Sequence, residues 1–95
     1  MYLVFCGVRD AEALLAHLLI LTSSDISVAS DVVGVRVSSA EEAERILADR
    51  FISGMEDVPG GYWYAETVDD GRFEDLSESA LRARGRGSAG RRLRH

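Results

Sequence analysis

The fold is decided by the stretch Ile26-Ser-Val-Ala-Ser-Asp-Val-Val-Gly-Val-Arg-Val37. Apolar and small polar residues alternate at its start, and valine recurs at every second position from Val33 to Val37. A period of two is typical of strands with one buried face. Ser30 and Asp31 between the two runs are common turn residues. The stretch therefore predicts two short strands, 26–29 and 32–37, paired as an antiparallel hairpin.

A helix is expected on each side of this hairpin. Asp10 is a good N-cap for a helix from Ala11 to about Leu21, whose leucines recur at helical spacing. After the hairpin, Ser39-Ala-Glu-Glu42 matches a capping box, in which the serine and glutamate side chains satisfy backbone donors of the first turn. The second helix is predicted to run from there to about Phe51.

Two further strands complete the pattern. The first, Tyr2–Val8, is apolar on both alternating faces, which indicates a strand in the middle of a sheet. Tyr62–Val68 is rich in aromatic residues and also favours a strand. Asp70-Gly71 is a hairpin signal, so Arg72–Leu76 is expected as an optional short fifth strand.

The resulting order, βαββαβ, resembles that of the ferredoxin-like fold. The resemblance implies an α+β domain with an antiparallel sheet, two helices on one face, and the first and third strands at the centre. The hairpin disfavours a flavodoxin-like fold, which needs parallel crossovers. We expect a compact acidic domain over residues 1–81 and a disordered arginine-rich tail over residues 82–95, where glycine, serine and arginine leave little to bury.

Charge divides the chain close to the same place. The 95 residues carry a net charge of −5. Residues 1–78 hold all sixteen acidic residues and five arginines, whereas residues 79–95 hold six arginines and no acid. The acidic part is a poor partner for nucleic acid, but the tail can bind phosphates. All basic residues are arginine, whose codons are GC-rich, so we expect a high-GC genome such as that of an actinobacterium or one of its phages.

The segment 32–47 resembles the third strand and second helix of RNA-recognition-motif domains, which stack bases on aromatic residues of their central strands. Here the corresponding strand positions hold Val32 and Gly34. The resemblance supports the fold and argues against an RNA-binding sheet.

Catalytic chemistry has little support in the sequence. Cys6 and His17 are the one conceivable pair of nucleophile and base, and a cysteine in an apolar strand is more simply a buried hydrophobe. Two lone histidines and one cysteine give no metal-ligand spacing. We therefore predict no catalytic residue, no metal and no cofactor. The apolar start shows no cleavable leader pattern, so a cytoplasmic location is expected.

Surplus apolar and aromatic surface points instead to binding. Tyr62 and Tyr64 are expected on one strand face with Tyr2 nearby, on the open side of the sheet, if Trp63 packs beneath the helices. Leu19 and Ile20 lie off the core stripe of their helix. The predicted interaction face consists of Tyr2, Tyr62, Tyr64, Leu19 and Ile20.

Three functions follow from these patterns. The preferred one is a non-enzymatic interaction or regulatory module that binds a protein partner or itself. The second is a nucleic-acid-associated protein that uses an anion-binding tail, formed by Arg82, Arg84, Arg86, Arg91, Arg92 and Arg94. The third is a small cofactor-free enzyme or ligand-binding dimer, which requires an apolar cavity over the sheet with His17 or Tyr64 facing it.

Overall fold

The computed structural model describes residues 1–94, and side chains as far as residue 83. Four strands form one antiparallel sheet in the order β2-β3-β1-β4. Their bounds are β1 Tyr2–Cys6, β2 Ile26–Ala29, β3 Val32–Arg36 and β4 Tyr64–Val68. The α+β class and the central position of the first and third strands are as the sequence predicts. Both central strands are buried over nearly their whole length.

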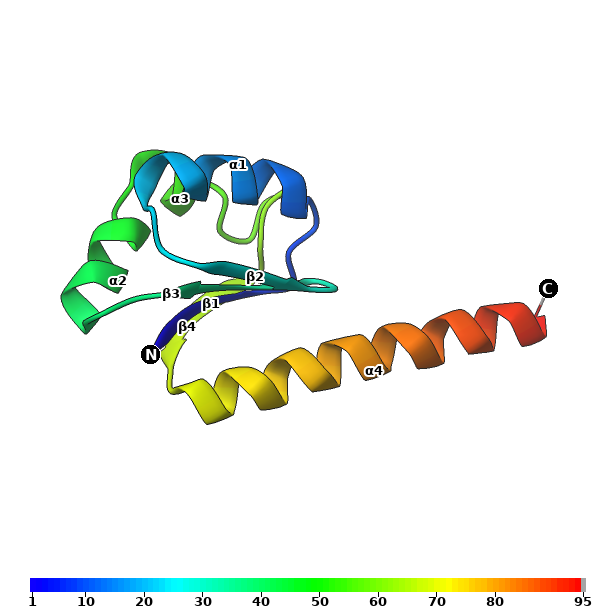
Figure 1. Ribbon diagram of the computed structural model, residues 1–95. Coiled ribbons are helices and arrows are strands. Elements are labelled where there is room, and N and C mark those ends of the chain that lie inside the picture. Colours follow the sequence, from blue (N-terminus) through cyan, green and yellow to red (C-terminus); the bar gives the residue numbers. More distant parts are fainter. Residues whose placement is uncertain (95) are drawn as a thin grey trace.

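Three helices cover one face of the sheet: α1 (Ala11–Leu21), α2 (Ala40–Leu47) and α3 (Arg50–Gly54) (Figure 1). The predicted single helix to Phe51 is therefore wrong beyond Leu47. The Asp49 carboxylate accepts hydrogen bonds from the backbone N–H groups of Phe51 and Ile52, at 3.0 and 3.1 Å, and starts a new helix at Arg50. This change of direction turns Ile52 into the core and leaves Phe51 exposed.

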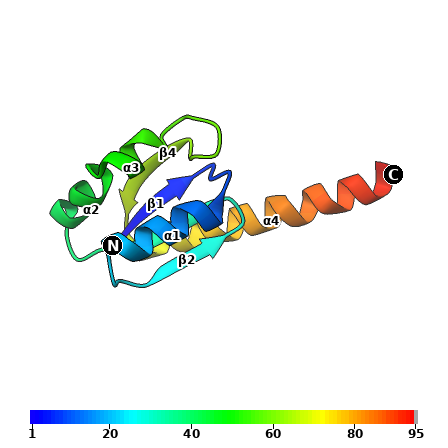
Figure 2. The same ribbon diagram turned by 90° about the horizontal axis from the view of Figure 1, so that it is seen from above.

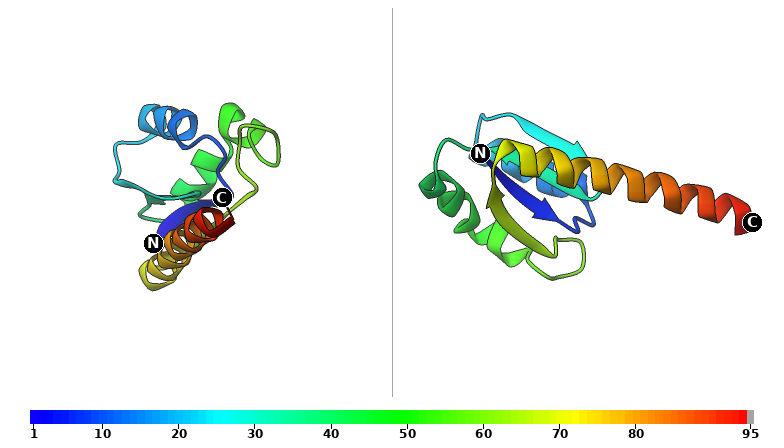
Figure 3. Two further views of the ribbon diagram at one scale, coloured as in Figure 1. Left: turned by 90° about the vertical axis from the view of Figure 1, so that its right-hand side faces the viewer. Right: turned by 90° about the horizontal axis from the view of Figure 1, so that it is seen from below.

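A fourth helix, α4 (Asp70–Arg94), lies on the opposite face of the sheet, so the helices form two layers rather than one (Figure 3). The expected fifth strand at 72–76 is wrong. The Asp69 carboxylate accepts a hydrogen bond from the Arg72 backbone N–H at 2.7 Å, which caps a helix directly after β4. Phe73, Leu76 and Ala80 recur at helical spacing and pack against the sheet.

Gly34 in β3 makes room for this helix. An added Cβ at Gly34 would lie 2.4 and 2.5 Å from two ring atoms of Phe73, closer than packed carbon atoms approach. The Phe73 ring also stacks against the ring of Tyr2, with centroids 4.2 Å apart. The space left by the absent side chain of Gly34 is therefore filled by Phe73, which lies 39 positions later in the sequence.

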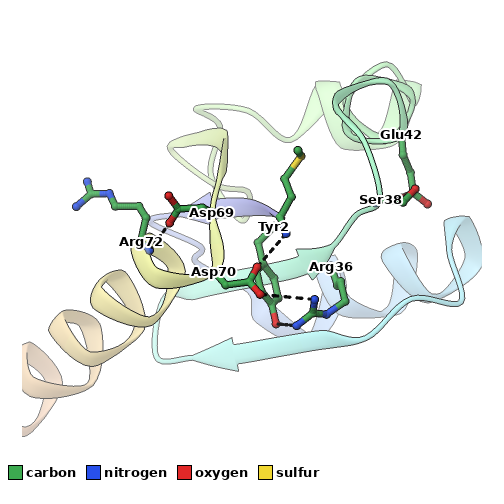
Figure 4. Close-up of polar contacts among 8 residues, drawn as sticks. Tyr2, Arg36, Ser38, Glu42, Asp69, Asp70 and Arg72 are labelled. Atoms are coloured by element: carbon green, nitrogen blue, oxygen red, sulfur yellow. Dashed lines mark hydrogen bonds and ion pairs between the residues drawn. The ribbon is translucent and has the colours of Figure 1, made fainter.

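Polar groups hold the first turn of α4 next to the start of β1. The Asp70 carboxylate lies 2.9 Å from the Met1 amine and 3.7 Å from the Arg36 guanidinium (Figure 4). Arg36 also donates a hydrogen bond to the Tyr2 hydroxyl at 2.8 Å and lies over the Tyr2 ring, 4.8 Å from its centroid. The amine and the guanidinium lower the pKa of Asp70.

Helix α4 passes the predicted domain boundary between residues 81 and 82 without a break and extends past the β2–β3 turn (Figure 1). The arginine side chains after Ala83 and the whole of His95 lie outside the described residues. The division into a compact domain over residues 1–81 and a disordered tail over residues 82–95 stays a prediction. Over the described part of the chain, every helix is too short or too polar to cross a membrane.

Candidate interaction surface

The predicted tyrosine face is not open, because α4 covers it. Tyr2 and Tyr64 lie on this side of the sheet, as expected, and pack half-buried around a cluster that includes Val4 and Phe73. They are thus the contact between the sheet and α4 rather than a free surface. Val32, at one of the positions where RNA-recognition motifs stack bases, is also buried beneath this helix.

Tyr62 does not share a face with Tyr64, which corrects the strand pattern. Its backbone pairs with the loop before it: the Asp57 N–H donates to the Tyr62 carbonyl at 2.6 Å, and the Tyr62 N–H donates to the Met55 carbonyl at 3.0 Å. β4 begins only at Tyr64, so the alternation of side chains does not extend back to residue 62. Tyr62 is 2% exposed, and its hydroxyl donates to the Ile52 carbonyl at 3.0 Å.

Trp63 is exposed, so the packing beneath the helices that was the condition for an open tyrosine face does not occur. Its backbone N–H donates to the Cys6 carbonyl at 2.9 Å, and its indole ring lies edge-on to the Tyr64 ring with centroids 4.9 Å apart. Gly7 faces it with φ of +68°, and an added Cβ there would lie 2.9 Å from Cβ of Trp63. The absence of a side chain at Gly7 therefore leaves room for Trp63 against the end of β1.

Leu19 and Ile20 are the members of the predicted face that remain accessible, with 61% and 79% of their surface exposed. They lie on the outer side of α1, whose buried residues are Leu14 and Leu18. Phe51, 53% exposed, was missed by the sequence pattern and lies on α3 beside His17 of α1. Its ring stacks on that of His17, one turn before Ile20, with centroids 4.2 Å apart. Around α1, Phe51 lies on the side of His17, Leu19 on the opposite side and Ile20 between them on the solvent side. We call Leu19, Ile20 and Phe51 the outer apolar surface.

His17 has a structural partner rather than a nucleophile. Its Nε2 lies 2.8 Å from Oδ2 of Asp49, which joins α1 to the start of α3. The backbone N–H of Ile52, followed by His17, lowers the pKa of Asp49. Cys6 lies in the cluster on the other side of the sheet, where burial raises the pKa of its thiol. The structure therefore does not bring Cys6 and His17 together.

The surface recesses do not lie over the sheet, where the third candidate function requires a cavity. Both faces of the sheet are packed, with Leu3, Val4, Phe5 and Val33 fully buried. One recess lies at the rim and is lined by Met1 and residues 67–71. Within the described residues, no three histidine, cysteine or acidic side chains gather as metal ligands.

Similarity to known proteins does not add to this site. No family model matches the chain, and neither a curated protein nor a solved structure is significantly similar to it.

Proposed function

We propose that this protein is a small interaction or regulatory module that works by binding, not catalysis, and that it associates with a second copy of itself. We also propose that its fold is ferredoxin-like, with α4 added over the second face of the sheet. The antiparallel strand order, with β1 and β3 central, supports that assignment. A cytoplasmic location and an origin in an actinobacterium or phage belong to the same proposal.

The observation that carries the proposal is the exposure of Ile20 next to Leu19 on α1. Single exposed aliphatic residues are common, but adjacent ones beside an exposed aromatic are typical of a contact surface. Phe51 supplies that aromatic through its stacking on His17. Leu19 and Ile20 belong to neither buried cluster of the domain, so a partner is the simplest means of removing them from water.

Electrostatics favours an apolar contact. Residues 1–83 hold sixteen acids against six arginines. Two such domains repel each other unless they meet at a neutral surface or bring arginines to it. The outer apolar surface is uncharged, and the arginines of α4 after residue 81 offset the repulsion.

Sedimentation equilibrium over a range of protein concentrations tests the proposal. We expect a reversible dimer, and Ile20→Gln should weaken it by about tenfold through lost apolar burial. Leu81→Gln is the matched control, because Leu81 is a similarly exposed aliphatic residue on α4. A wild-type chain that stays monomeric at every concentration would overturn self-association.

Nucleic-acid binding through the tail is the second candidate. The observation that favours it is the direction of α4, which extends past the sheet and carries six arginines and no acid after residue 81. A gel shift with full-length protein and with a chain ending at Leu81 tests it at several salt concentrations. Phosphate contacts predict binding that is lost with the tail and falls steeply with salt; absent or salt-insensitive binding rejects it.

A further inference from the structure

The sheet has two edges, and they differ in how open they are to another strand. β2 forms one edge and β4 the other. β2, Ile26-Ser-Val-Ala29, contains no charge and no proline. Native edges are commonly protected by such residues, because an edge strand offers unpaired backbone groups. β4 has this protection in Glu66, so β2 is the less protected edge.

The backbone of β2 presents its free groups at two positions. Arg36 donates its N–H to the Asp25 carbonyl at 3.0 Å, and the register then pairs Ser27 with Gly34. Since hydrogen-bonded pairs alternate along antiparallel strands, Asp25 and Ser27 direct their groups toward β3. Ile26 and Val28 therefore direct their N–H and C=O groups away from the sheet.

The side chains next to this edge are apolar. Val28 is 48% exposed, on the same sheet face as α1, because it lies opposite Val33 of the α1-side core. Figure 2 shows α1 over the β2 side of the sheet and α3 over the β4 side. His17 faces α3 through Asp49, so Leu19, two residues and about 200° further around the helix, is on the side toward β2.

From these observations we propose that β2 pairs antiparallel with β2 of a second copy, which joins the two sheets edge to edge. Ile26 of each copy lies opposite Val28 of the other, and the two outward positions exchange four backbone hydrogen bonds. The contact is self-complementary, as a two-fold axis through the Ser27 pair requires.

The second copy is the occupant that this edge fits best. Two aliphatic cross-strand pairs form at its centre, and Leu19 of each α1 covers them. β2 itself carries no charge on a strongly acidic domain, and Asp25 and Asp31 flank it. About the Ser27 axis, Asp25 of one copy lies opposite Ala29 of the other, so the two copies can meet here without placing carboxylates opposite each other. Pairing through β4 would bring Glu66 of both copies to the same interface. The inference rests on the proposed self-association and extends its contact from Leu19 and Ile20 of α1 to the adjoining β2 edge.

Proline and lysine substitutions at Val28 test the pairing. Val28→Pro removes an N–H that faces outward and is not part of the β2–β3 ladder, a position where an edge strand tolerates proline. Val28→Lys places a charge on the edge instead. The matched controls are Thr67→Pro and Thr67→Lys. Thr67 is exposed on the β4 edge. The Val37 N–H donates to the Met1 carbonyl, so Leu3, two residues after Met1, also directs its backbone groups toward β3. Thr67 lies opposite Leu3, and its own backbone groups therefore point outward from the sheet.

Sedimentation equilibrium should show the dimer dissociation constant rising at least about tenfold in both Val28 variants, since each dimer loses two donors or gains two edge charges. The Thr67 variants should dimerise like wild type. Circular dichroism checks that each variant folds. Amide hydrogen exchange gives a measurement without substitution: the Ile26 and Val28 amides should become protected as the protein concentration rises.

Three outcomes are decisive. Loss of the dimer in the folded Val28 variants alone supports the pairing. A dimer that persists in both overturns the pairing while self-association stands. A monomeric wild type with unprotected Ile26 and Val28 amides overturns both.

Discussion

Replacing Gly34 by alanine should push helix α4 away from the sheet. The new methyl group would start 2.4 Å from the Phe73 ring, and that ring is stacked on Tyr2, so it cannot retreat without losing a second contact. Overpacking of a filled core costs about 1–3 kcal/mol. Alanine recovers about 0.4–1 kcal/mol by restricting the unfolded chain. The free energy of unfolding should therefore fall by about 1–2 kcal/mol.

Urea denaturation followed by circular dichroism measures this change. For a domain of this size each kcal/mol also lowers the melting temperature by roughly 4–8 °C. Gly54→Ala is the control, because an added Cβ there meets nothing within 4 Å. Phe73→Leu removes the ring that the new methyl group would meet. The double variant Gly34→Ala/Phe73→Leu should therefore lose about 1 kcal/mol less free energy of unfolding than the two single variants lose together. A stable Gly34→Ala chain, or strict additivity, would refute the packing of Phe73 over Gly34.

Three further changes test other contacts. Tyr62→Phe should reduce the free energy of unfolding by about 0.5–1.5 kcal/mol, because it removes one buried hydrogen bond to the Ile52 carbonyl, which keeps its bond from the Met55 N–H; an unchanged urea midpoint would contradict this. Ser77→Ala should raise it by about 1 kcal/mol, since the buried Ser77 hydroxyl has no hydrogen-bond partner in the described structure; destabilisation would indicate a partner. The lowered pKa of Asp49 stabilises the fold above its unfolded pKa, and this stabilisation is lost as pH falls through the folded value. Wild type should thus lose more stability than Asp49→Asn between about pH 5 and 2; parallel pH profiles would exclude this role.

The candidate surface could be predicted only in part. Leu19 and Ile20 were identifiable because helix periodicity shows which side chains the core cannot use. Phe51 was missed because it follows Asp49, and the sequence pattern continued the helix through that residue. A signal was present in the sequence. An aspartate can cap a new helix by accepting hydrogen bonds from the backbone N–H groups two and three residues later, as Asp49 does with Phe51 and Ile52.

By itself the sequence determined the four strands, the first two helices and their order, but not α3 or α4. The period of two at Val33–Val37, the caps at Asp10 and Ser39, and the apolar run from Tyr2 depend on neighbouring residues, so they can be recognised in a linear chain. They also constrain topology, because an apolar strand on both faces must lie inside the sheet.

Only the tertiary structure decided what covers the second face of the sheet. Alternation shows that Tyr2 and Tyr64 point to one side, but it does not say whether water, a partner or a helix of the same chain meets them. The answer depends on Phe73 fitting the space above Gly34, a match of shapes between distant residues. Shape complementarity of this kind arises only when the chain has folded, which is why an apparently open face proved to be closed and the accessible surface lies on α1 and at the β2 edge.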